Sequence, residues 1–166
     1  MKTVQITTNL WAFTLELDDI LAPNTVTNFL RYIEEGYYTG TLFHRVIPGF
    51  MVQGWGLEVG MIDKKTHAPI EHEWANGLKN THGTIAMART NDPHSATSQF
   101  FINTANNGFL DFTRASGMGW GYTVFGKVTE GMNIIDAIEK VDTTHRAGHD
   151  DVPRNDIIIE SVQVLA

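Results

Sequence analysis

One guanidinium stands among apolar side chains in an otherwise uncharged stretch near the first third of the chain. Arg45 is followed by Phe50 and Met51 and then by the amide of Gln53. Apolar surface with a few hydrogen-bond donors suits a proline-bearing peptide, because the ring needs an apolar pocket and the flanking amides need partners. The alternative interpretation is a pair of core strands whose arginine extends to the surface.

Two later stretches again place polar groups beside aromatic ones. Ser98–Asn103 reads SQFFIN, and Phe109 and Leu110 lie in an irregular, glycine-containing segment. These residues are further candidates for the wall of a peptide-binding surface.

The seven histidines are candidate metal ligands or catalytic residues of a hydrolase. His44 precedes Arg45, and on a strand the two side chains point to opposite faces, so we expect His44 to be a hydrogen-bonded core residue. The remaining candidates are His67, His72 and Glu73, then His145, His149, Asp150 and Asp151, and finally Ser95 and Ser98 near His94. The serines lack a G-x-S-x-G elbow and no phosphate-binding glycine loop is present. We therefore expect no metal site, no nucleophilic serine and no cofactor.

The elements that must position these groups follow from the spacing of apolar residues. Two stripes at helical spacing predict helices, one from Pro23–Asn24 to a cap at Gly36 and one after Gly131. Alternating or short apolar runs predict eight strands. These runs are Val4–Ile6, Phe13–Leu17, Leu42–Ile47, Met51–Gln53, Thr84–Ala88, Gln99–Ile102, Thr123–Val128 and Ile157–Val164.

Eight strands with two helices predict a mostly β protein, a closed eight-stranded antiparallel barrel capped by the helices, because closure removes exposed sheet edges. The segments Trp55–His82 and Asn103–Gly121 show no sustained period and are expected to be functional loops.

Composition narrows the class of protein. The chain has 166 residues, which suits one domain over 1–166. A formal net charge of −7 argues against nucleic acid or an anionic membrane as the main partner. The absence of cysteine excludes disulfides and thiolate chemistry. No apolar stretch resembles a signal peptide or a membrane span, so we expect a cytoplasmic protein.

Five stretches of the chain form a recognisable set of motifs. They are APNTVTN at 22–28, FHRVIPGFMVQG at 43–54, GTIAMAR at 83–89, SQFFIN at 98–103 and YTVFGKVTEGMNIID at 122–136. In these motifs and in their order the sequence closely resembles the cyclophilin family of peptidyl-prolyl isomerases, and above all the cytosolic cyclophilins of bacteria. The resemblance implies the barrel with two helices, a substrate groove on its outer face and rotation about X-Pro bonds in peptides and folding proteins without a cofactor. We expect a monomer.

The resemblance also implies roles for individual residues. Arg45 matches the catalytic arginine, and Phe50 and Gln53 complete the catalytic set, with Gln53 holding a substrate carbonyl. Substrate-binding positions are Met51, Ala88, Arg89, Phe101, Phe109, Leu110 and Tyr122.

Four positions depart from the better-known eukaryotic pattern. Phe109 replaces a tryptophan whose indole N–H helps bind cyclosporin, so we expect weak cyclosporin binding. Tyr122 replaces a histidine and Arg89 an asparagine. Trp55 replaces a glycine and is expected to make the rim of the groove narrower or stickier. Rival hypotheses are a proline-peptide binding module or chaperone without turnover, and a metal-dependent hydrolase.

Overall fold

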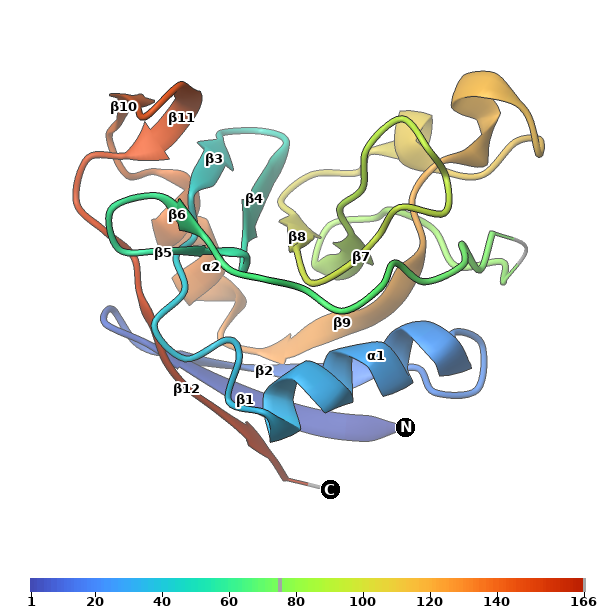
Figure 1. Cartoon of the computed structure of the whole chain (residues 1–166), viewed down its shortest axis with the longest axis horizontal. Coiled ribbons are helices and arrows are strands. Elements are labelled where there is room, and N and C mark those ends of the chain that lie inside the picture. The colour runs from blue at the N-terminus through green and yellow to red at the C-terminus, as the bar shows by residue number, and fades with distance from the viewer. Residues whose placement is uncertain (75, 166) are drawn as a thin grey trace.

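The computed structural model describes residues 1–74 and 76–165 of the chain. An eight-stranded antiparallel sheet dominates it, with the strand order β12-β1-β2-β9-β7-β8-β4-β3 (Figure 1). All eight correspond to the runs predicted from the sequence, which confirms the mostly β class. The strands are β1 (Lys2–Thr8), β2 (Ala12–Leu17), β3 (Arg45–Ile47), β4 (Met51–Gly54), β7 (Thr84–Met87), β8 (Phe100–Asn103), β9 (Val124–Glu130) and β12 (Ile159–Val164).

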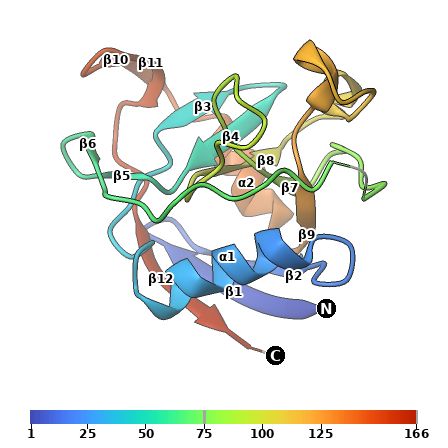
Figure 2. The same cartoon turned by 45° about the vertical axis from the view of Figure 1, so that its right-hand side comes forward.

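The sheet curls strongly, and a short segment outside the named strands joins its two edges. β3 and β12 are the edge strands. Just before β3, Leu42 forms an antiparallel bridge with Ile158. The Phe43 N–H donates to the Ile157 carbonyl at 3.0 Å, and the Ile159 N–H donates to the Thr41 carbonyl at 2.9 Å. The predicted barrel is thus a curled sheet whose edges meet through this bridge rather than through a full strand pair (Figure 2).

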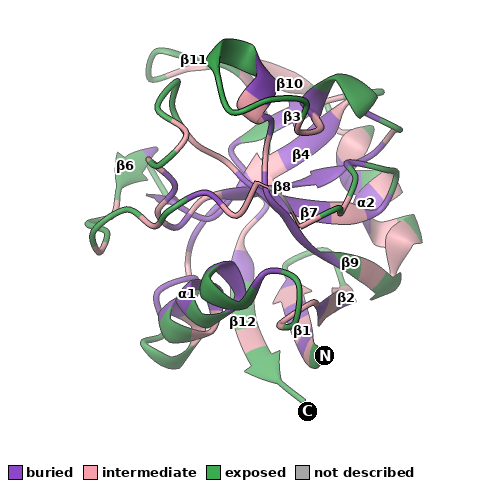
Figure 3. Cartoon of the chain, turned by 90° about the vertical axis from the view of Figure 1, so that its right-hand side faces the viewer, coloured by how far each residue is buried: buried purple, intermediate pink, exposed green. Residues whose placement is uncertain are grey.

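Two α-helices, α1 (Pro23–Glu34) and α2 (Met132–Glu139), contribute to the same core as the strands. Phe29 of α1 and Ile135 of α2 are fully buried in that core. In Figure 3 the buried colour runs through β7, β8 and the first part of β9, while α1 alternates between buried and exposed faces, as its apolar stripe predicts.

The ends of α1 have partners that explain where the helix begins and ends. At the C-terminus the Gly36 N–H donates to the Ile33 carbonyl at 3.0 Å, with Gly36 at φ +69°, which confirms the predicted glycine cap. At the N-terminus the carboxylate of Glu73 accepts from the Thr25 N–H at 2.6 Å. A residue far along the chain therefore supplies the cap that the local sequence lacks.

Two small hairpins fall within segments where no strand was predicted. They are β5 (Leu57–Glu58) with β6 (Ile62–Asp63), and β10 (Thr143–Arg146) with β11 (His149–Pro153). The loop expected over residues 55–82 thus contains the first of them. Two-residue strands are too short to show an apolar period, so the sequence pattern could not reveal it.

Trp55 lies in the core, and the expectation that it shapes the rim of the groove is wrong. Its side chain is fully buried and packs against the rings of Tyr38 and Phe43, at centroid distances of 5.3 and 5.6 Å. The backbone at Trp55 has φ +84°, a conformation that glycine adopts at little cost and a bulky residue rarely does. This backbone turn sends the indole inward. Trp11, in contrast, is 73% exposed between β1 and β2.

Neither α1 nor α2, within the described ranges, is long and apolar enough to cross a membrane.

Candidate active site

Side chains of β4, β7 and β8 alternate between two separate apolar clusters, one on each face of the sheet. In β8, Phe100 and Ile102 belong to the main core, whereas Phe101 belongs to a second cluster with Met51 of β4 and Leu110. The alternation follows from the two-residue period of a strand. The second cluster therefore lies on the face of the sheet opposite the main core.

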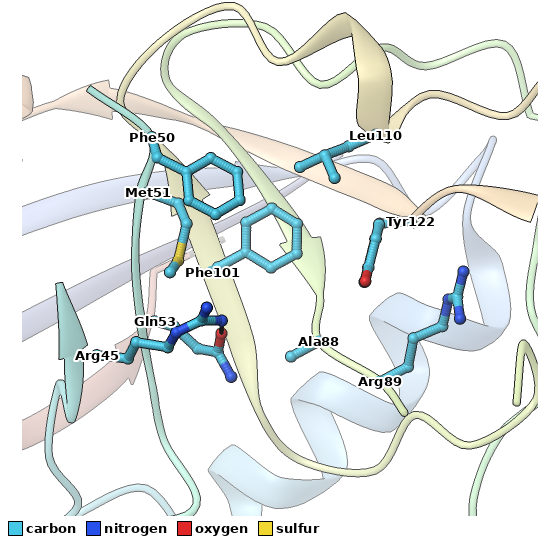
Figure 4. A pocket seen from close by; sticks show the side chains of 9 residues that line it. All are labelled: Arg45, Phe50, Met51, Gln53, Ala88, Arg89, Phe101, Leu110 and Tyr122. Atoms are coloured by element: carbon cyan, nitrogen blue, oxygen red, sulfur yellow. Dashed lines mark hydrogen bonds between the residues drawn. The ribbon is translucent and has the colours of Figure 1, made fainter. Parts of the chain in front are cut away.

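A pocket of about 120 Å³ opens on this second face (Figure 4). Because pockets for drug-sized ligands measure roughly 300–1,000 Å³, this pocket suits one small ring or side chain rather than a nucleotide or flavin. Nine of the ten site residues predicted from the sequence line it. They are Arg45, Phe50, Met51, Gln53, Ala88, Arg89, Phe101, Leu110 and Tyr122.

The polar edge of the pocket is built by the pairing of β3 with β4. Arg45 and Gln53 are directly opposed in the antiparallel register. The exposed Arg45 donates from Nη1 to Gln53 Oε1 at 3.5 Å, and Gln53 Nε2 donates to Gln99 Oε1 at 3.2 Å. Gln99, within the SQFFIN stretch, had no predicted role. The guanidinium thus stands at the edge of an apolar pocket with a polar amide beside it (Figure 4).

The opposite edge is held by Arg89 and Tyr122. The Arg89 guanidinium lies 4.5 Å from the centre of the Tyr122 ring. Its Nε and Nη2 atoms donate to the Gly121 carbonyl at 3.0 and 2.7 Å. The Tyr122 ring in turn packs edge-on against Phe101 at 5.6 Å. Arg89 therefore fixes the wall of the pocket instead of projecting freely into it.

This face of the sheet can bind a small apolar ring beside a hydrogen-bonding chain. A family model described as cyclophilin type peptidyl-prolyl cis-trans isomerase/CLD matches residues 3–164. The chain is 53% identical over 165 residues to a peptidyl-prolyl cis-trans isomerase, cyp18, of Streptomyces antibioticus, and the match covers 99% of each chain. It is 58% identical over 146 residues to peptidyl-prolyl cis-trans isomerase B of Escherichia coli K12, covering 88% of this chain and 89% of that one. The chain belongs to the cyclophilin family.

As a cyclophilin it is a peptidyl-prolyl cis-trans isomerase, an enzyme that works without a cofactor. Its fold matches a crystal structure of a cyclophilin-type isomerase of Cryptosporidium parvum with a TM-score of 0.81 and 26% identity, over 99% of this chain and 98% of that one. Another structure of the same protein, determined in the presence of the dipeptide Ala-Pro, matches with a TM-score of 0.80 over 99% of both chains.

Phe109 is the one predicted site residue of this cyclophilin that does not line the pocket. Its ring stacks on Phe50 with the centroids 5.7 Å apart, and the side chain is 73% exposed. It therefore supports a pocket wall from outside.

Buried asparagines that the sequence reasoning missed hold the backbone of the pocket. Asn80 is 1% exposed and donates from Nδ2 to the carbonyls of Leu110 and Tyr122, at 3.1 and 3.4 Å. Its own N–H donates to Asp111 Oδ1 at 2.6 Å. One amide therefore connects two segments that each carry a pocket residue.

The network continues from Asn80 to the other side of the pocket. The fully buried Asn103 donates to Asn80 Oδ1 at 3.1 Å. Asn107 donates to Asn103 Oδ1 and to the Phe50 carbonyl, both at 2.8 Å. The sequence shows these asparagines in and around the irregular segments, which could have indicated a hydrogen-bonding network. The carbonyls that they reach, however, depend on the fold.

His44 is buried and does not line the pocket. It is 5% exposed, as expected for a core residue. Burial, together with the nearby His149 and Arg45, lowers the pKa of His44 from 6.5 to about 4, so the ring is neutral at neutral pH. The expected hydrogen bonding is incomplete, since Nδ1 has no partner among the described residues.

The other histidine groups have structural partners. His67 Nε2 lies 2.6 Å from Glu35 Oε2, and His145 Nδ1 lies 2.7 Å from Asp150 Oδ1. His72 Nε2 lies 3.0 Å from the Gly121 carbonyl. Within residues 1–74 and 76–165 no three His, Cys, Asp or Glu side chains come together as metal ligands.

Proposed function

We propose that Arg45 is the principal catalytic group of this isomerase and that Phe50 and Gln53 act with it. The observation that carries the proposal is the position of the guanidinium at the edge of the small apolar pocket that contains Phe101. A proline ring seated in that pocket would bring its nitrogen to the polar edge, where Arg45 and Gln53 lie.

The reaction sets a modest energetic requirement. Rotation about a peptide bond has a barrier of about 18–20 kcal/mol. The uncatalysed isomerisation of an X-Pro bond takes tens of seconds, a rate of about 0.01–0.1 per second. A turnover of about 10 per second, typical of enzymes, requires the barrier to fall by roughly 3–4 kcal/mol.

A single donor suffices for most of this reduction. In the twisted transition state the prolyl nitrogen becomes pyramidal and regains a lone pair that the planar ground state does not offer. A donor that reaches this lone pair stabilises the transition state selectively, which is the condition for catalysis. Arginine is always protonated and so is always a donor. One preorganised donor contributes about 2.7–4 kcal/mol in other enzymes.

The remaining residues of the pocket bind and orient the substrate. Met51, Phe101 and Leu110 supply the apolar walls for the ring, and this environment also favours the twisted amide, which is less polar than the planar one. Gln53 holds a substrate carbonyl, and the backbone at Ala88 and Arg89 pairs with the peptide. Phe109 and Tyr122 complete the binding surface.

The proposed substrates are proline-containing peptides and folding proteins. The Cryptosporidium relative crystallised with Ala-Pro supports this class of ligand. We further propose weak cyclosporin binding, a monomeric enzyme of one domain over 1–166 and a cytoplasmic location. Titration with cyclosporin, sedimentation and cell fractionation test these points in turn.

Replacement of Arg45 by alanine tests the catalytic proposal. We expect kcat/KM for an Ala-Pro peptide, measured by exchange NMR or a protease-coupled assay, to fall at least about tenfold and up to about a thousandfold. Folding should be unaffected to within about 0.5 kcal/mol, because Arg45 is exposed and its side chain contacts Gln53 at the hydrogen-bond limit. Arg31→Ala, which removes an exposed arginine from α1, is the matched control. Near-normal activity of Arg45→Ala would overturn the assignment.

A further inference from the structure

A second cavity of about 390 Å³ adjoins the proline pocket and has no role in the mechanism described above. It shares three wall residues with the proline pocket, namely Arg89, Leu110 and Tyr122. Phe109 and Met118 form the rest of its apolar lining. The second cavity, called here the flanking groove, is therefore continuous with the substrate site.

The flanking groove exposes large apolar side chains that the fold leaves uncovered. Met118 is 94% exposed and Phe109 is 73% exposed. Single exposed apolar residues are ordinary, but two that border one cavity beside a binding site mark a surface for an apolar group. Removing such a group and the groove walls from water together would favour binding.

The outer wall of the flanking groove, residues 111–121, is held in place by its own contacts. The Thr113 N–H donates to the Gly119 carbonyl at 2.7 Å. Trp120, which follows Met118 in a 3₁₀ turn over Gly117–Trp120, packs against Trp74 with ring centroids 5.0 Å apart and against His94 at 5.3 Å. Because the wall is anchored, little conformational entropy would be lost when a ligand binds.

Arg89 lines both cavities, and its guanidinium is bound to local partners. Its Nε and Nη2 atoms donate to the Gly121 carbonyl, its Nη1 atom donates to the Thr90 carbonyl at 2.8 Å, and its Cζ atom lies over the Tyr122 ring. The guanidinium thus acts as a wall of the flanking groove, and the surface that remains for a ligand is predominantly apolar.

We propose that the flanking groove is a specificity subsite that binds one apolar side chain of the substrate, such as Leu, Met or Phe, at a position within three residues of the proline. Three residues of extended chain span roughly 10 Å, which suffices to reach an adjoining cavity. Side chains of an extended peptide alternate between opposite sides, so only every second position can face the groove. The inference rests on the proposed seating of proline in the first pocket.

A positional scan of the substrate tests this subsite. Isomerisation is measured on peptides with an Ala-Pro centre, in which one Phe is placed in turn at each of the three positions before and after the Ala-Pro pair, against an all-alanine background. In the wild-type enzyme we expect one position at which Phe raises kcat/KM about fivefold or more, mainly through KM.

The variant Met118→Ser should remove most of that gain while leaving the all-alanine peptide unaffected, and Met118→Leu should restore it. Ile62→Ser, which removes a 62% exposed apolar residue from β6, is the matched control and should retain the gain. Figure 1 places β6 on the side of the molecule away from the segment 111–121.

The failures of the two proposals differ. The wild-type enzyme could turn over the all-alanine peptide and yet show the same kcat/KM wherever Phe is placed. This result would overturn the subsite and leave the role of Arg45 intact. A gain that persists in Met118→Ser, or that Ile62→Ser also loses, would overturn the subsite as well. No turnover of any peptide would overturn both proposals.

Discussion

The buried His44 should make the protein sensitive to mild acid. The pKa of His44 is lowered to about 4 in the folded protein, because burial disfavours the charged ring and His149 and Arg45 add positive charge nearby. In the unfolded chain the ordinary histidine value of about 6.5 applies. Between these two values the unfolded state binds the proton and the folded state does not, so the free energy of unfolding falls as the pH falls.

The two pKa values set the magnitude of the effect. The contribution of His44 to stability is complete above about pH 6.5. It decreases by about 2 kcal/mol from pH 7 to pH 5 and by about 3 kcal/mol by pH 4. These losses are a large fraction of the roughly 5–15 kcal/mol that stabilises a typical domain.

The assay is urea unfolding followed by tryptophan fluorescence at several pH values, comparing the wild type with His44→Gln. The variant loses the titrating ring. Whatever its stability at pH 7, its free energy of unfolding should therefore fall by about 2 kcal/mol less than that of the wild type between pH 7 and pH 5. His82→Gln, which removes a half-exposed histidine, is the matched control. Parallel curves for the wild type and His44→Gln would refute the reasoning.

Three further predictions concern the site. Turnover should be nearly constant from about pH 6 to pH 9, because none of the nine described residues lining the proline pocket is a histidine or cysteine, the side chains that ordinarily titrate there; a bell-shaped profile of kcat/KM would contradict this. Phe109→Trp should tighten cyclosporin binding, measured by calorimetry, because the indole supplies an N–H donor on an exposed ring; an unchanged Kd would show that this position is not the cause of weak binding. Asn80→Ala should lower the free energy of unfolding by about 1–3 kcal/mol and reduce kcat/KM, since the carbonyls of Leu110 and Tyr122 lose their donor. Asn133→Ala, at an exposed position, is the control. If Asn80→Ala is destabilised but fully active, Asn80 does not position the pocket residues.

Apolar spacing predicted the strands of the sheet because a strand has to place alternate side chains on opposite faces. Phe100 and Phe101 of β8 lie in different clusters, as this rule requires. The expected difference between His44 and Arg45 also holds, since His44, just before β3, is buried and Arg45 is exposed. The same rule could not reveal the hairpin β5–β6, whose strands have two residues each. It could not reveal β10–β11 either, because the sequences TTHR and HDDVP contain almost no apolar residues to alternate. It also could not place Trp55, because a backbone at positive φ reverses the direction that the spacing implies.

Apolar spacing in the sequence determined the eight strands, because alternation is a local property of a strand. The match of its motifs to the cyclophilin family determined the family and the nine residues that line the proposed proline pocket. Only the tertiary structure decided what surrounds them. Glu73 caps α1, Asn80 joins two pocket segments, and Met118 borders a second cavity, each by contacts between residues distant in the chain. Such contacts depend on how the sheet curls and where the loops return, and no local pattern encodes either.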